Sequence, residues 1–274
     1  MRAIVAVDES ACARNAADIA IDLASRRPGM ELTAVHIVNV VKPSGNLLKD
    51  LPGRLGFEPA VVSEEVGERH DEEGRIVLAA VKERAAAQGI ELRSVLDHGA
   101  VNDRLSHHAG HADLLVLGQT GETNERFPGQ GGATAHHLVS ETTGTKLLVR
   151  PHGRPIRRVL VGYDGSEAAS HGLSLIRRLG PSAVQSVHAV WVDTGTGDDN
   201  PLGGIDSHLE GFDVTTSVLT GESVSGAISA YAKSADIDTI AIGFSGKSAV
   251  HDFFFGRGYE TLLAEQEFNL LIAH

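Results

Sequence analysis

The chain has 274 residues, with 36 acidic against 24 basic side chains for a formal net charge of −12, and an aromatic content of 4%. Its length favours two domains that each bury a core, and its acidity opposes broad binding to nucleic acid or to an anionic membrane. A single cysteine, Cys12, excludes an intramolecular disulfide and any metal site of paired cysteines, so a reducing, cytoplasmic setting fits best.

The first half of the chain predicts strands that alternate with helices. "MRAIVAVDES" enters an apolar strand and reaches Asp8 too soon for a signal peptide, and a serine then starts an amphipathic helix. A second strand begins near Glu31, a long helical stretch near Ser63, a strand near Ala112 and a last strand near Thr145. No apolar run approaches the length of a membrane span.

The second half repeats this order. A strand from Ile156 ends before Asp164, and further strands begin near Val184, Ile237 and Asn269. The succession strand, helix, strand, crossover, strand, helix, strand, helix, strand therefore occurs twice. The crossover between the second and third strands is much shorter in this half, with room for one short helix at most. We expect a barer flank on the second domain.

This alternation predicts an α/β fold of two tandem doubly wound, Rossmann-like domains with parallel five-stranded sheets. Proline and glycine in "RPHGRP" place the boundary between domains of residues 1–152 and 153–274. Ligands of such folds bind at the carboxyl ends of strands where the strand order reverses. The final strands, "KLLVR" and "NLLIA", are apolar edge segments, and an unpaired apolar edge invites strand addition.

A glycine pattern follows a strand in each half. The pattern is G-x-x-G, nine residues and a third glycine, at Gly118, Gly121 and Gly131 and again at Gly243, Gly246 and Gly256. Glycines at a passage from strand to helix free backbone N–H groups for an anion, and the helix start adds its own. The lysine of a P-loop is missing. Any phosphate held here would be held mainly by backbone groups.

Three features recur in register in both halves: the strand-end aspartate, the second strand with its histidine, and the glycine spacing. In these features the chain resembles the universal stress protein family in its tandem form. The resemblance covers nearly the whole chain. It implies a cytoplasmic stress-response protein that binds adenine nucleotide, ATP with or without Mg²⁺, and that is regulatory rather than catalytic. It also implies that the final strands pair across a pseudo-twofold axis, so that one chain imitates a dimer. Further self-association and the identity of a protein partner stay open.

The resemblance also assigns roles to residues. Asp8 lies near the ribose, the main chain of Ile37 after the strand histidine meets adenine, and Leu117 packs beside the sugar or base. The second half offers Asp164, Ala189 and Ile242 for these roles. The complete candidate set is Ala6, Asp8, Ile37, Leu117, Gly118, Gly121, Gly131, Gly132, Ala133 and Thr134 in the first half, and Asp164, Ala189, Ile242, Gly243, Gly246, Gly256, Arg257 and Gly258 in the second.

The chain departs from the family pattern after the third glycine, where nucleotide binders carry serine or threonine. Gly132 loses that hydroxyl, which is worth about 0.5–1.5 kcal/mol, but Thr134 supplies another close by. Arg257 can reach a phosphate or fill the cradle itself, and Tyr259 adds bulk. We expect one well-occupied nucleotide per chain, in the first domain, with the second site empty or holding a smaller anion.

Each assignment has a structural alternative. A strand-end aspartate such as Asp8 can cap the following helix, and the glycines can serve as loop residues alone. His36 and His188 alternate with apolar neighbours on buried strands, so hydrogen-bonded core histidines are expected rather than ligands.

A metal site and a catalytic centre find little support. His107, His108 and His111 cluster before a strand, but Gly110 is expected to end their helix, so the first and last rings need not share a face, and solvated histidines are expected. There is no G-x-S-x-G elbow, and Cys12 is interpreted as a buried small hydrophobe. Slow ATP hydrolysis stays open. The alternative to nucleotide binding is a scaffold that acts through protein contacts alone.

Overall fold

The computed structural model describes residues 1–39, 59–121, 133–193, 195, 199–221, 223–243 and 258–273, and of residues 59–66 and 258–259 the helical backbone alone. The first half contains β1 (Arg2–Ala6), α1 (Ala11–Arg26), β2 (Glu31–Val38), α2 (Pro59–Ala87), β3 (Leu92–His98), α3 (Val101–Ala109), β4 (Leu114–Gly118), α5 (Ala133–Glu141) and β5 (Lys146–Val149). The second half contains β6 (Arg158–Gly162), α6 (Glu167–Leu179), β7 (Ser186–Asp193), α7 (Ile205–His208), β8 (Asp213–Thr220), α8 (Val224–Ser234), β9 (Thr239–Gly243), α9 (Gly258–Glu265) and β10 (Asn269–Ala273).

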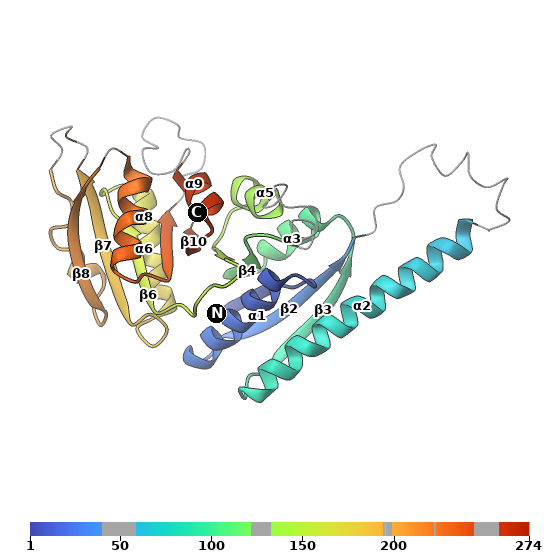
Figure 1. The fold of residues 1–274 in the computed structure, drawn as a ribbon. Coiled ribbons are helices and arrows are strands. Elements are labelled where there is room, and N and C mark those ends of the chain that lie inside the picture. The colour runs from blue at the N-terminus through green and yellow to red at the C-terminus, as the bar shows by residue number, and fades with distance from the viewer. Residues whose placement is uncertain are drawn as a thin grey trace.

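The described strands form one ten-stranded sheet that runs through both halves (Figure 1). Its order is β3-β2-β1-β4-β5-β10-β9-β6-β7-β8, so each half contributes five parallel strands in the same relative order. This is the doubly wound arrangement that the alternation of strands and helices predicts, and the α/β fold class is confirmed.

The two final strands join the halves. β5 and β10 pair antiparallel, with Leu148 opposite Leu270 and Leu147 opposite Leu271. The predicted pairing of the last strands is confirmed, because neither apolar edge is left open to water at this junction.

Helices cover both faces of the sheet. α1, α2 and α6 pack on one face in a core that includes Val5 of β1, and α3, α5, α8 and α9 pack on the other face beside Ile4. Successive residues of a strand point to opposite faces, so the continuous apolar sequence of β1 serves both cores.

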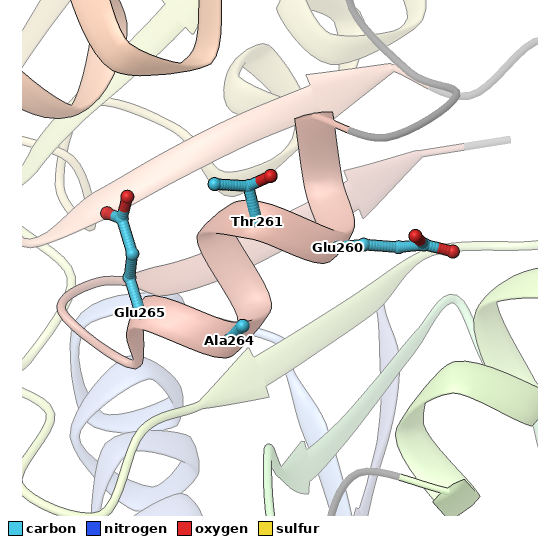
Figure 2. Close-up of a pocket in the computed structure, with 4 residues that line it drawn as sticks. All are labelled: Glu260, Thr261, Ala264 and Glu265. Carbon is cyan, nitrogen blue, oxygen red and sulfur yellow. The ribbon is translucent and has the colours of Figure 1, made fainter.

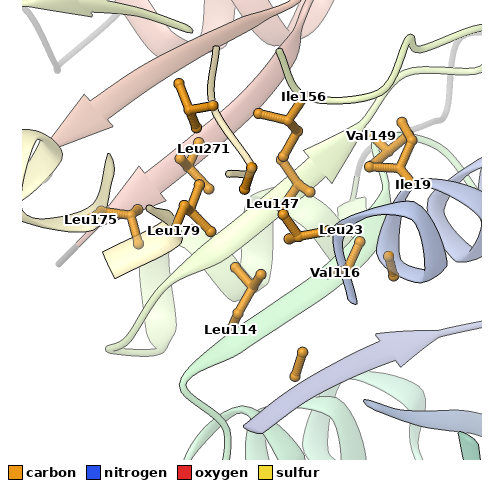
Figure 3. Packing of buried hydrophobic residues seen from close by; sticks show 14 of the residues in the cluster. Ile19, Leu23, Leu114, Val116, Leu147, Val149, Ile156, Leu175, Leu179 and Leu271 are labelled. Atoms are coloured by element: carbon orange, nitrogen blue, oxygen red, sulfur yellow. The ribbon is translucent and has the colours of Figure 1, made fainter. Parts of the chain in front are cut away.

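The junction of the halves is hydrophobic on the face that carries α1 and α6. Figure 3 shows Leu147 and Leu271 from the paired strands together with Leu23 of α1 and Leu179 of α6, all almost completely buried. Burying a leucine side chain contributes about 1.5–3 kcal/mol. Side chains from both halves therefore share one core across β5 and β10.

The halves differ in how their outer strands are covered. The long helix α2 packs Leu78, Val81 and Ala85 against β2 and β3, whereas the described residues of the corresponding crossover in the second half contain only the four-residue α7. The described part of this crossover agrees with the expectation of one short helix. The edge strand β8 is exposed along much of its length, with Val218 49% exposed. No helix in the described ranges, including the charged α2, is both long and apolar enough to cross a membrane.

Candidate functional site

The carboxyl ends of β1 and β4 form the topological switch point of the first half. β1 pairs with β2 on one side and with β4 on the other, and α1 and α3 leave the sheet on opposite faces. Such a reversal opens a crevice outside the strand ends. Asp8 follows β1 by two residues and Gly118 ends β4, so both lie at this point.

Asp8 shapes the turn into α1 but does not cap the helix. Its Oδ1 accepts a hydrogen bond of 2.8 Å from the Ser10 backbone N–H, and the Ser10 hydroxyl oxygen accepts from Ala13 N–H as the N-cap. Asp164 and Ser166 repeat the arrangement before α6. The alternative of Asp8 as the helix cap is therefore wrong, and the half-buried carboxylate stands at the strand end.

Gly121 brings the loop backbone against the Asp8 carboxylate. A Cβ atom on Gly121 would lie 3.3 Å from Oδ2 of Asp8. The φ angle of Gly121 is outside the left-handed region, so its conformation does not itself demand glycine. A larger side chain would occupy the space directly beside the carboxylate. The two residues therefore bring a hydrogen-bond acceptor next to the partly exposed Gly121 backbone.

Gly118 has a different reason to be glycine. A Cβ atom there would lie 2.8 Å from the Thr120 carbonyl oxygen and 2.9 Å from Cys12 Cβ, because the start of α1 packs directly on β4. Cys12 is fully buried, and its Sγ donates to the Val149 carbonyl oxygen at 2.9 Å. Burial raises the pKa of this thiol. The interpretation of Cys12 as a buried small side chain is confirmed.

Three candidate residues line one face of the sheet at this edge. Ala6 and Ile37 are partly buried and Leu117 is buried, and all three pack on the core beneath α3 and α5. They provide an apolar surface next to the turn at Asp8, of the kind that a flat aromatic base can lie against. The contact of the Ile37 main chain with adenine stays a prediction.

The first turn of α5 supplies the last described candidates. Ala133 is exposed and Thr134 is half-buried at the start of this helix, where N–H groups lack partners within the helix. Gly131 and Gly132 lie outside the described residues.

A cluster around Asp97 was not predicted from the sequence. Its Oδ2 accepts hydrogen bonds of 2.8 Å from Arg104 Nε and from His108 Nε2, and its Oδ1 accepts from the His98 N–H. Partial burial would raise the pKa of Asp97, but these hydrogen bonds outweigh it and lower the pKa to about 2. The signal in the sequence is an aspartate at a strand end before a helix that carries Arg104 and His108 four residues apart. The cluster ties α3 to the end of β3, beside Ile37.

The histidine cluster on α3 divides into two environments. His107 and His111 are exposed, as expected, although their ring centroids approach to 4.8 Å. The expectation of a solvated side chain is wrong for His108, which is half-buried on Asp97. Within the described residues, no three or more His, Cys, Asp and Glu side chains group as a metal site.

The two strand histidines are structural. His36 Nδ1 lies 2.9 Å from the Val7 carbonyl oxygen, and His188 Nδ1 lies 3.0 Å from the Tyr231 hydroxyl. Burial, and then the charge of Arg158, lowers the pKa of His188. The prediction of hydrogen-bonded core histidines is confirmed.

The strand registers correct one correspondence between the halves. Ala6 pairs with Val35 in the first half, and its counterpart Gly162 pairs with Val190 in the second. Counting along the strands matches Ile37 with Val192, so Ala189 is not its counterpart. Ala189 is fully buried on the opposite face, in the core under α6.

The other candidates of the second half are dominated by packing. A Cβ atom on Gly243 would overlap the Ala168 carbonyl oxygen of α6, and Ile242 is buried. Gly258 starts α9. Gly246, Gly256 and Arg257 lie outside the described residues.

A shallow depression of about 520 Å³ lies on α9 (Figure 2). Glu260, Thr261, Ala264 and Glu265 line it. Glu265 accepts a hydrogen bond of 2.7 Å from the Ser229 hydroxyl. Two carboxylates disfavour a phosphate here, so this surface does not compete with the switch point as a nucleotide site.

Comparisons with known proteins agree with this architecture. Residues 1–150 match the model of the universal stress protein family. A universal stress protein of Synechocystis sp. (strain ATCC 27184 / PCC 6803 / Kazusa) is 27% identical over 191 residues, which are 68% of this chain and 66% of that protein. The chain thus matches slightly less than two thirds of the length of this curated relative.

A solved structure extends the likeness of the fold to the second half. A universal stress protein from Archaeoglobus fulgidus DSM 4304 matches 99% of this chain and 95% of its own with a TM-score of 0.73 at 17% identity. A family protein from Arabidopsis thaliana with AMP bound covers 54% of this chain and 90% of its own, with a TM-score of 0.37 at 12% identity. The family model spans more than half of the sequence, and this chain therefore belongs to the universal stress protein family.

Proposed function

We propose that this protein binds an adenine nucleotide, ATP with or without Mg²⁺, in a first domain of residues 1–152, and that it acts in the cytoplasm as a nucleotide-dependent regulator. The observation that carries the proposal is the approach of Gly121 to the Asp8 carboxylate at the topological switch point. Among the described residues, the contact within 4 Å of a Cβ atom on Gly121 is with Asp8, and the conformation of Gly121 does not account for its small size.

The described residues fit the parts of a nucleotide. The Asp8 carboxylate can accept hydrogen bonds from ribose hydroxyls, because its two oxygens carry several acceptor sites and Ser10 N–H uses one of them at Oδ1. Ile37 and Leu117 offer an apolar wall for the base. We expect the phosphates to meet the Gly121 backbone N–H and the first turn of α5, with Thr134.

A regulatory role agrees with how the reactive side chains near the site are used. The Cys12 thiol is buried with a raised pKa, so it is a poor nucleophile. Asp97 is held ionised by Arg104 and His108, which makes it a poor general acid. Both side chains hold elements of the site together rather than present reactive atoms to a ligand.

The second domain, residues 153–274, should bind nucleotide less well. Its Gly243 is required by the packing of α6, so the glycine is not by itself a sign of a ligand. Arg257 stands where nucleotide binders of the family have a hydroxyl, and Tyr259 follows it. We expect one nucleotide per chain.

Two measurements test the proposal. Small molecules released from freshly purified, denatured protein are identified by mass spectrometry, and titration calorimetry with ATP gives affinity and stoichiometry. We expect adenine nucleotide near one equivalent per chain. Absence of ATP binding at millimolar concentration would overturn the proposal in favour of a scaffold that acts through protein contacts, and two equal sites would overturn the ranking of the domains. Arg257→Ser then shows whether that side chain limits the second site.

A further inference from the structure

Gln119, the second residue of the first glycine loop, is buried at the junction of the two halves. Only 1% of its surface is exposed. Its backbone N–H donates to the Val149 carbonyl oxygen at 2.8 Å, which extends the pairing of β4 with β5 by one residue beyond Gly118. The residue that separates Gly118 from the turn at Gly121 is thus fixed to the end of β5.

The Gln119 side chain reaches into the other half. Its Nε2 donates to the Phe268 carbonyl oxygen at 2.7 Å and lies 3.4 Å from the Leu148 carbonyl oxygen. Phe268 immediately precedes β10, and Leu148 lies in β5 opposite Leu270. One amide group therefore bridges the first glycine loop, the last strand of its own half and the start of the last strand of the other half.

The acceptor end of the same amide is left without a partner. Gln119 Oε1 is buried and makes no hydrogen bond with any described residue. An unpaired buried carbonyl is unfavourable, so an apolar side chain of similar length would avoid this cost. The hydrogen bonds that Nε2 donates are therefore what this side chain contributes to the structure.

A second polar contact ties the same region to the linker between the halves, residues 150–155. Asn269 at the start of β10 donates from Nδ2 to the Arg154 carbonyl oxygen at 2.9 Å and accepts from the Arg150 N–H at 3.4 Å. Asn15 of α1 donates to the carbonyl oxygens of Arg150 and Gly153. The start of β10 is therefore hydrogen-bonded to the glycine loop and to the linker. The linker is in turn hydrogen-bonded to α1, the helix that begins at the Asp8 turn.

The bridging amide has no equivalent at the matching position of the second glycine loop. The residue that follows Gly243 in the second glycine loop is Phe244, which has no side-chain donor. A reciprocal amide bridge from the second loop to the first half is therefore excluded by residue type.

We infer that Gln119 couples nucleotide occupancy of the first domain to the pairing of β5 with β10, so that ligand binding in one half tightens its junction with the other. This inference rests on the proposed function. Fixing the loop at Gly121 around a phosphate also fixes Gln119 two residues earlier, and its amide transmits the restraint to Phe268. Linkage requires the reverse as well, so a tighter junction favours the nucleotide.

Gln119→Met tests the coupling, since methionine keeps the length of the side chain and removes both the donor and the unpaired acceptor. Hydrogen exchange of the backbone amides in residues 268–270 is measured with and without ATP in the full chain. In the parent, ATP should slow exchange there. In the variant, exchange without ATP should be about 2- to 10-fold faster, as expected for one lost hydrogen bond, and ATP should no longer slow it, while ATP binding persists with a similarly modest loss of affinity.

Arg157→Gln is the matched control. Arg157 binds Asp22 of α1 through two hydrogen bonds of 2.9 and 3.0 Å, so its loss loosens the halves away from the glycine loop. ATP should still slow exchange in residues 268–270 of this variant. If ATP binds the parent but leaves residues 268–270 unchanged, or protects them equally in Gln119→Met, the coupling is refuted and the proposed function stands. If the parent does not bind ATP, both are refuted.

Discussion

Replacement of Gly121 by leucine tests the contact on which the proposed nucleotide site depends. The first atom of the new side chain would lie 3.3 Å from Asp8 Oδ2, which is tight but tolerable, and the remaining atoms would extend into the space beside the carboxylate. The fold should tolerate the change, because Gly121 is partly exposed and its φ angle suits an L-residue. The effect should therefore fall on the ligand.

The expected loss follows from the hydrogen bonds at risk. A hydrogen bond to a charged acceptor contributes about 1.5–3 kcal/mol, so losing one ribose hydroxyl from Asp8 weakens ATP binding about tenfold or more. Displacement of phosphate from the loop backbone adds to this. Titration calorimetry of the parent and Gly121→Leu gives the ratio of dissociation constants directly.

Gly203→Leu is the control for adding the same side chain to a glycine. Gly203 is exposed, has no heavy atom within 4 Å of its would-be Cβ and has no positive φ. Thermal unfolding should leave both variants close to the parent, and only Gly121→Leu should lose affinity. A Gly121→Leu protein that is folded and binds ATP within twofold of the parent would show that no ligand approaches this part of the loop.

Three further outcomes follow from the same structure. Asp8→Asn keeps an oxygen for the Ser10 N–H but removes the charge, so ATP affinity should fall at least several-fold while inorganic triphosphate binding, measured by competition, changes little. Asp97, with its pKa lowered to about 2, stabilises the fold fully above its ordinary pKa of 3.8. This contribution is about 1–2 kcal/mol, reduced for solvent screening. Urea unfolding of the parent should show that it is lost between about pH 4 and pH 2, whereas Asp97→Asn should show no such loss. Burial lowers the pKa of Lys146 from 10.5 to about 8, so the unfolded chain binds more protons than the folded protein between these pH values. The parent should therefore gain stability relative to Lys146→Met as pH rises from 8 to 10.5. The gain should be at most about 2 kcal/mol, because three carbonyl oxygens also stabilise the ammonium.

The sequence predicts most of the fold because the decisive signals are local. Alternating apolar strands and amphipathic helices lead to the doubly wound order, and Ser10 and Ser166 mark the helix starts by their side chains. Two short apolar edge strands predict strand addition, and the resemblance to the family implies that β5 and β10 pair with each other, as the structure shows.

Register is the feature that sequence similarity between the halves misplaces. His36 and His188 both precede small or aliphatic residues, yet the strand pairs show that they stand three positions apart. An odd offset along a strand reverses the face. Accordingly, a Cβ on Gly74 of α2 would meet the His36 ring, whereas His188 bonds Tyr231 of α8 on the other side of the sheet.

The contacts of Asp97 and Gln119 could not be predicted for a related reason. Each joins residues that are brought together by the topology: Asp97 meets a helix after a turn, and Gln119 meets Phe268, which lies 149 residues later in the chain. A single polar residue carries no periodic signal, and its partner is defined only once the two halves are paired. Such side chains are visible in the sequence but their roles are not.

The glycine pattern combines positions with different physical causes. Gly118 and Gly243 each end a strand under the first turn of a helix, where a Cβ atom would collide with Cys12 or with the Ala168 carbonyl oxygen. These two glycines are needed for α1 and α6 to pack on the sheet, with or without a ligand. Gly121 alone among the described glycines of the pattern faces a carboxylate rather than a packed helix. The first glycine can therefore persist in a half that has lost nucleotide affinity, and the position next to the strand-end aspartate is the informative one for binding.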